Sequence, residues 1–295
     1  MNTDVAAPGT HEAPVSRSSL WKDAGRRFWK NKTAVAALCL LTLMALASVF
    51  ADFLTPYGPF ETDLKQVKAP PGPEHILGSD ENGRDILTRI LFGARISLSV
   101  GFISVAISTV IGSIVGLVSA YYGGWVDILL SRFMEMIASF PSILLAIIFM
   151  SVFGRGIQNA VIAIAIVSIP GPARIIRSTA LSVKENDYVT SARAIGSRAS
   201  GIIIKHILPN IMAPIIVNAT MSVSGAILSL ASLGFLGLGV QPPTAEWGYM
   251  LSSGRNYIFS ASHIITFPGI AIALTVLSFN LLGDGLRDAL DPRLK

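Results

Sequence analysis

The chain has 295 residues, of which 52% are hydrophobic and 14% charged, and its mean hydropathy is +0.60. A soluble globular domain is excluded, because so few charged side chains cannot cover its surface, and the chain is expected to lie in a lipid bilayer. The net charge of +5 is modest, and no nucleic-acid partner is expected. Cys39 is the single cysteine, which excludes a disulfide framework.

The N-terminal segment, residues 1–32, is polar and ends in a basic cluster mixed with Trp21, Phe28 and Trp29. This composition is typical of a disordered tip followed by a short helix at the membrane interface. The first apolar run, residues 33–54, would be about 33 Å long as a helix and can cross the bilayer. A cleaved secretory signal is the alternative. We favour a retained anchor, because the preceding tail is long and the run exceeds the apolar core of a signal.

Residues 55–95 are expected to form an outer loop that ends in an amphipathic helix entering the membrane. The loop is rich in proline and contains Asp80, Asn82 and Asp85, a spacing that invites a calcium-loop interpretation. That interpretation is excluded, because the loop lacks the glycine at the sixth position and the glutamate at the twelfth. Helix capping is the predicted role of these side chains.

Five further apolar runs follow and predict six transmembrane helices in total. Gly112 and Gly116 lie four residues apart and predict close helix packing, and Pro141 predicts a kink. The last run is followed by a tail, residues 284–295, and the permeation core is expected to comprise residues 96–283. The five runs are 96–120, 128–153, 157–180, 211–239 and 264–283.

Six spans place both termini on one side of the membrane. Assigning that side as cytoplasmic puts most of the 23 lysines and arginines inside, which agrees with the positive-inside rule. Arg174 and Arg177, at the inner end of the fourth run, are therefore interpreted as orientation anchors, and steering of a substrate is the alternative.

Sequence motifs of catalysis are absent from the chain. It has no G-x-x-x-x-G-K-[ST] phosphate loop, no HExxH and no GxSxG, and its four histidines are scattered. An intramembrane protease or zinc enzyme is therefore not predicted, and any energy from ATP must come from a partner.

The stretch from Asp187 to Asn210 lies between the fourth and fifth runs and is basic and partly amphipathic. Small residues in its first half would let a short helix sit close against another protein, which Tyr188 and Arg193 could bind. Its second half returns to isoleucine and leucine before Pro209, which is expected to fix where the chain turns. We expect one end to dock on a partner and the other to enter the membrane.

This layout resembles the cytoplasmic coupling loop of ATP-binding-cassette (ABC) importer permeases, here residues 181–210. The family pattern falls on Thr190-Ser191-Ala192, Gly196, His206 and Leu208-Pro209. Thr190 replaces an acidic residue and His206 an apolar one, so the resemblance does not imply a salt bridge from Thr190 to the ATPase. It assigns the coupling role to Asp187, Tyr188, Thr190, Ser191, Ala192, Arg193, Gly196, His206, Leu208 and Pro209.

Other blocks resemble the dipeptide, oligopeptide and nickel branch of these permeases. They are Gly78-Ser79-Asp80 with Gly83-Arg84-Asp85, the stretch SLGFLGLGVQPPTAEWG at 232–248, and the terminal FNLLGDGLRDALDPRLK. The resemblance covers nearly the whole chain from Leu20 and indicates the second permease subunit of a dipeptide or oligopeptide importer. It implies an all-α type I importer fold, with six transmembrane helices and a cytoplasmic coupling helix, in the bacterial inner membrane.

The resemblance also implies a set of partners: a homologous second permease, two ATPase subunits and an extracytoplasmic solute-binding protein. ATP and Mg²⁺ would bind to the ATPases, so no cofactor and no metal site is expected in this chain. Closure of the ATPases would push the coupling loop, and the helix bundle would rock between inward and outward openings. Nickel, glutathione or another small solute is the alternative substrate.

Polar side chains within the apolar runs have two interpretations that the sequence leaves open. They could line a substrate path, or they could form hydrogen bonds between helices. The residues concerned are Asn218, Ser222, Ser224 and Asn280. Outside the transporter class, a channel without an ATPase is the remaining alternative, and a docking loop of this shape would be superfluous in it.

Overall fold

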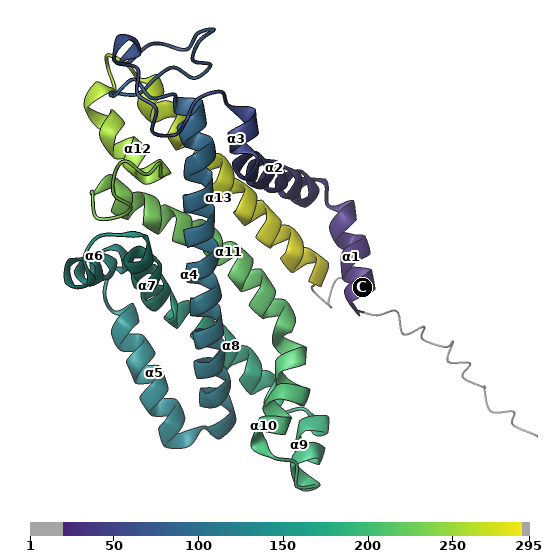
Figure 1. Ribbon diagram of the computed structural model, residues 1–295. Coiled ribbons are helices and arrows are strands. Elements are labelled where there is room, and N and C mark those ends of the chain that lie inside the picture. Colours follow the sequence, from purple (N-terminus) through teal and green to yellow (C-terminus); the bar gives the residue numbers. More distant parts are fainter. Residues whose placement is uncertain (1–19, 291–295) are drawn as a thin grey trace, which may run out of the picture.

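The computed structural model describes residues 20–290, which fold into helices joined by turns and loops, with one isolated bridge between Ser79 and Asp85. The longest helix, α4 (Ile86–Tyr122), runs the length of the molecule (Figure 1). The loop before α4 and the short helix α12 (Trp247–Gly254) lie at one end, and α9 (Asp187–Ala194) lies at the other. The predicted all-α fold is confirmed for the described residues.

One polar residue, Asn31, lies between the first two N-terminal helices. Its side chain accepts the backbone N–H of Ala34 at 3.2 Å and caps the second helix, which separates that helix from the first. The predicted first span, residues 33–54, comprises the second and third helices, which are separated at Phe50. The three helices of this region are α1 (Leu20–Lys30), α2 (Lys32–Val49) and α3 (Ala51–Leu54).

The helix α4 corrects the predicted boundary between residues 95 and 96. The entering helix and the second span are one helix of 37 residues, about 55 Å long. It begins where it does because Asp85 accepts the backbone N–H of Thr88 at 2.7 Å. No proline interrupts the 37 residues, so the amphipathic start runs directly into the apolar part.

The third run is broken far more sharply than a kinked span. It forms α5 (Gly124–Ala138) and α6 (Ser142–Phe153), whose axes differ by 89°. Pro141 precedes α6 and donates no hydrogen bond, so it can start that helix but cannot continue α5. Residues 20–290 contain five helices long and apolar enough to span a membrane, or six when this bent pair is taken as one span.

Helices α4 and α8 (Pro170–Lys184) pack closely through glycines. A side chain at Gly116 would meet the carbonyl oxygen of Ala173 at 2.6 Å, and one at Gly112 would meet Pro172 at 2.9 Å. The predicted role of this glycine pair in helix packing is therefore confirmed. The fourth run comprises α7 (Ile157–Ser168) and α8, which extends to Lys184.

The last two spans differ from their predicted ends. The fifth ends at Phe235, not at residue 239, because Gly237 adopts φ +73° and turns the chain. The sixth continues to Leu290, seven residues beyond its predicted end. Two buried apolar clusters form the core, one across most spans and one at the end that carries α9. The remaining elements are α10 (Ala199–Ile202), α11 (Met212–Phe235) and α13 (His263–Leu290).

Candidate functional site: the coupling loop and the outer cap

Helix α9 ends in a turn that requires glycine at position 196. Gly196 has φ +79°, its N–H bonds to the carbonyl of Arg193 at 3.0 Å, and the next N–H, of Ser197, bonds to the carbonyl of Ala192 at 3.1 Å. These two bonds form a Schellman motif, which stops a helix and satisfies its last carbonyl groups. A side chain at Gly196 would meet nothing within 4 Å, so its backbone conformation, and not space, is the requirement there.

The two faces of α9 are different. Val189 and Ala192 are buried in a cluster with residues of α4 and α8, whereas Tyr188 is 43% exposed. Of the residues assigned to coupling, Ala192 thus faces the chain's own core. The exposed members of the set on this helix and its end are Asp187, Tyr188, Thr190, Ser191, Arg193 and Gly196. A polar, small-residue face is therefore left open at this end of the molecule.

The second half of the coupling loop stays helical, which corrects the predicted turn at Pro209. It passes through a π-helical turn, Ile203–Ile207, and a 3₁₀ turn, Leu208–Ile211, before α11 begins. Proline lacks an N–H, and the locally changed hydrogen-bonding pattern accommodates it. His206 and Leu208 are half-buried and Pro209 is exposed, so the assigned residues lie on one continuous segment that leads into α11.

The four polar residues of the fifth and sixth spans do not gather around one cavity. Ser224 donates a hydrogen bond to Asn280 at 3.0 Å and links α11 to α13, while Ser222 bonds to the carbonyl of Asn218 within α11. The Asn218 Oδ1 atom is buried and has no partner among the described residues. An apolar groove of about 520 Å³ between α2, α4, α11 and α13 is lined by none of the four. For Ser224 and Asn280 the structure supports the helix-linking interpretation.

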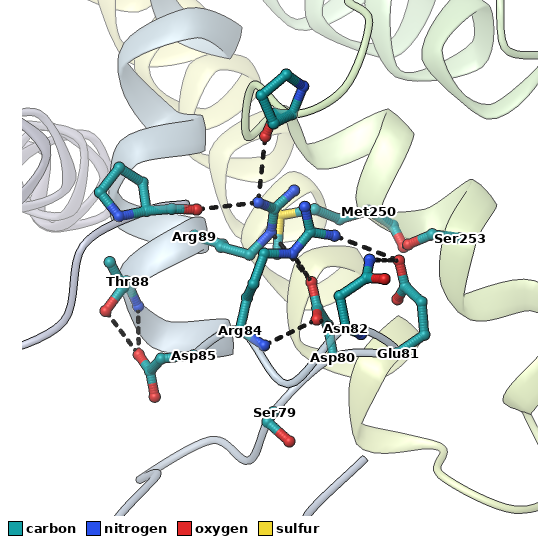
Figure 2. Close-up of polar contacts among 12 residues, drawn as sticks. Ser79, Asp80, Glu81, Asn82, Arg84, Asp85, Thr88, Arg89, Met250 and Ser253 are labelled. Carbon is teal, nitrogen blue, oxygen red and sulfur yellow. Dashed lines mark hydrogen bonds and ion pairs between the residues drawn. The ribbon is translucent and has the colours of Figure 1, made fainter. Parts of the chain in front are cut away.

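A buried ionic cluster joins the two segments that were predicted to lie on the outer side, residues 55–85 and 236–262, which we name the outer cap after that prediction. Arg84 pairs with Asp80 at 2.7 Å, and Arg89, which is 1% exposed, lies 3.4 Å from the same carboxylate (Figure 2). Arg89 also donates to the carbonyls of Pro59 and Pro243 at 3.1 and 3.3 Å. These contacts bind the start of α4 to both loops of the outer cap. From the sequence, only helix capping was predicted for the acidic side chains of the first loop.

Glu246 fixes the second loop of the outer cap. Its carboxylate accepts the backbone N–H groups of Gly248 and Tyr249 at 2.8 and 2.9 Å and so caps α12. Burial raises the pKa of Glu246 to about 7, and these two backbone hydrogen bonds oppose the rise. Gly234 must be glycine for this contact, because a side chain there would collide with the carboxylate. Gly234 and Gly239 therefore serve packing, whereas Gly237 serves the turn.

The chain is similar to known proteins along almost its whole length. The family described as "Binding-protein-dependent transport system inner membrane component" matches residues 90–295, and "N-terminal TM domain of oligopeptide transport permease C" matches residues 19–71. The dipeptide transport system permease protein DppC of Alkalihalophilus pseudofirmus is 48% identical over 94% of this chain and 91% of its own. The glutathione transport system permease protein GsiD of Pectobacterium atrosepticum is 45% identical over 93% and 92%.

Solved structures of low sequence identity share the fold. An inward-facing form of the MetNI methionine ABC transporter aligns with a TM-score of 0.56 at 20% identity, over 69% of this chain and 96% of that chain. Its fold agrees with the predicted type I arrangement. Together with the family matches, the coupling loop and the membrane-spanning helices, this shows that the chain belongs to the binding-protein-dependent ABC importer permeases of the inner membrane.

Proposed function

We propose that this chain forms half of the pathway of a di- or oligopeptide importer and receives its energy through the coupling loop. The observation that carries the proposal is the exposed polar face of α9, displayed at the end of the molecule opposite the outer cap (Figure 1). A surface of this kind can occupy a groove of a separate ATPase that binds ATP and Mg²⁺. In this arrangement α9 and both termini are cytoplasmic, and the outer cap faces the solute-binding protein.

The burial pattern of α9 supports transmission of force. Val189 is fully buried in a cluster with Leu117 of α4 and Ile176 of α8, so α9 packs against both helices through apolar contacts. On the same helix, the exposed face offers small side chains that permit close approach of a partner. A push on the exposed face is therefore passed to α4 and α8, and the bundle can move between its two openings.

Gly196 provides the sharpest test. Gly196→Val forces a β-branched residue into the left-handed region, at a cost of about 1–2 kcal/mol or more, whereas Gly196→Asn is tolerated there. We expect Gly196→Val to lower uptake by about 5- to 30-fold, the population change that such an energy produces, while the protein stays in the membrane. Gly201→Ala is the matched control, because Gly201 lies nearby in α10 and a side chain there meets nothing within 4 Å.

The measurement is peptide uptake by cells that carry the variant in place of the native chain, with membrane levels determined by immunoblot. Uptake by Gly196→Val equal to that by Gly201→Ala would refute the coupling role. The substrate is tested separately, by comparing uptake of dipeptides, tripeptides, glutathione and nickel in cells lacking the chain. Loss of peptide uptake supports the peptide assignment, and selective loss of glutathione or nickel uptake overturns it. Glutathione is included because a relative 45% identical is named for its transport.

A further inference from the structure

The corner between α4 and α5, residues 119–127, is contacted by side chains of two further helices, α8 and α9. Two consecutive glycines, Gly123 at φ +63° and Gly124 at φ +52°, turn the chain there without the strain that a side chain would cause. The turn brings the first residues of α5 against α8, and α9 contacts the end of α4 through Arg193. Basic side chains of α8 and α9 converge on the corner: Arg177, Lys184 and Arg193.

The centre of the corner is an ion pair between α5 and α8. Arg177 donates from Nε to Asp127 Oδ1 and from Nη2 to Oδ2, both at 2.5 Å, in the two-pronged geometry that makes arginine–carboxylate pairs strong and directional. Ser119 of α4 and Ser131 of α5 also donate to the same carboxylate. One side chain, Asp127, therefore ties α5 to both α4 and α8.

The end of α4 is held by the two other cations. Lys184 donates to the carbonyls of Ala120 and Tyr121 at 3.0 and 2.9 Å, and a cation is favourable at the carboxyl end of a helix. The Arg193 guanidinium lies 5.6 Å from the centre of the Tyr121 ring, within reach of a cation–π contact. Arg193 belongs to α9, so the coupling helix itself touches the corner.

Helix α5 depends on these polar contacts for its position. None of its residues is buried by the described part of the chain, in contrast with α4 and α8, and its far end leads into the 89° bend before α6. Apolar packing within the described residues therefore holds α8 against α4 more firmly than it holds α5. The Asp127–Arg177 pair, whose side chains are 20% and 36% exposed, supplies the directional restraint that packing does not.

We propose that Asp127 and Arg177 are positioning residues that make α5 and α6 follow α8 when an ATPase displaces the coupling loop. The inference rests on the proposed function. It deepens that function by naming the joint through which the displacement reaches the α5–α6 segment. Without the pair, the coupling loop still moves α4 and α8, but α5 lags behind, so ATP is hydrolysed with less solute moved.

The test uses the intact transporter, purified with its second permease and ATPases and reconstituted in liposomes with the binding protein. Three variants are compared: Asp127→Asn, Arg177→Gln and the double variant. Uptake per ATP hydrolysed is expected to fall about tenfold in each, within the roughly 5- to 150-fold range of coupling energies. The double variant should be no worse than either single one, because the two residues act as a pair. ATP hydrolysis itself should stay near the native rate.

Matched controls exist on the same two helices. Arg132→Gln removes an exposed cation of α5 that pairs with Glu135 in solvent, and Arg174→Gln removes an exposed cation of α8, so both should leave uptake per ATP unchanged. An unchanged ratio in Asp127→Asn and Arg177→Gln would overturn the inference. A parallel loss of uptake and hydrolysis would also overturn it, since that pattern marks a merely structural role. If Gly196→Val uncouples transport but these variants do not, the inference fails and the proposed function stands.

Discussion

The contact between α4 and α8 allows a quantitative prediction at Gly116. A Cβ added there would lie 2.6 Å from the carbonyl oxygen of Ala173 and 2.9 Å from the backbone nitrogen of Arg177. Both neighbours are backbone atoms and cannot rotate away. Restoring an ordinary contact of 3.4 Å requires α4 and α8 to separate by about 0.8 Å. Overpacking of this kind costs about 1–3 kcal/mol, so Gly116→Ala should destabilise the protein despite the better helix propensity of alanine.

The assay is thermal unfolding of the purified protein in detergent, followed by a probe of tertiary structure. Gly225→Ala is the matched control, because Gly225 also lies within a spanning helix and a side chain there meets nothing within 4 Å. We expect a lower midpoint for Gly116→Ala and an unchanged or slightly higher one for Gly225→Ala. Equal midpoints for the two variants would refute the reasoning that backbone contact at Gly116 sets the distance between α4 and α8.

Two further predictions concern the outer cap. Asp80→Asn should lower the free energy of unfolding by about 3–5 kcal/mol, because Arg84 and Arg89 lose the buried charge that they share. Asp52→Asn, in an exposed pair, should lower it by less than about 1 kcal/mol. Chemical denaturation compares the two variants, and equal losses would contradict the prediction. The raised pKa of Glu246, about 7 against an ordinary 4.5, means that the folded state binds this proton more tightly than the unfolded state. The free energy of unfolding should therefore fall by about 3 kcal/mol as the pH rises from 4.5 to above 7. Unfolding midpoints measured across this pH range should fall less steeply for Glu246→Gln than for the native protein. An unchanged slope in the variant would contradict the prediction.

The sequence was sufficient for the helices whose signals are local. Long apolar runs predicted the spans, and the spacing of Gly112 and Gly116 predicted a close helix contact that the structure contains. It was insufficient for the continuity and direction of the helices. The cap by Asp85 was predicted, but that the entering helix and the second span form one helix of 37 residues was not. Pro141 predicted a kink, but the 89° angle between α5 and α6 is not encoded in hydropathy.

The coupling loop shows the same division. Gly196 was found from its spacing, and the structure supplies its reason, a left-handed residue that completes a Schellman motif. Sequence reasoning took Arg177 for an orientation anchor and passed over Asp127. The available signal was an acidic residue three positions after Gly124, but its partner lies 50 positions along the chain and only the fold brings the two together.

The unbroken length of α4 has a mechanical consequence. At about 55 Å, α4 is longer than the roughly 30 Å hydrocarbon layer. One uninterrupted helix therefore joins the outer cap at one end to the α4–α5 corner at the other. A helix without a kink tilts as a rigid body, so a tilt about its middle moves its two ends in opposite directions. In the proposed arrangement, solute delivered at the outer cap and ATP hydrolysed by a partner subunit at the opposite end therefore act on the same rigid helix.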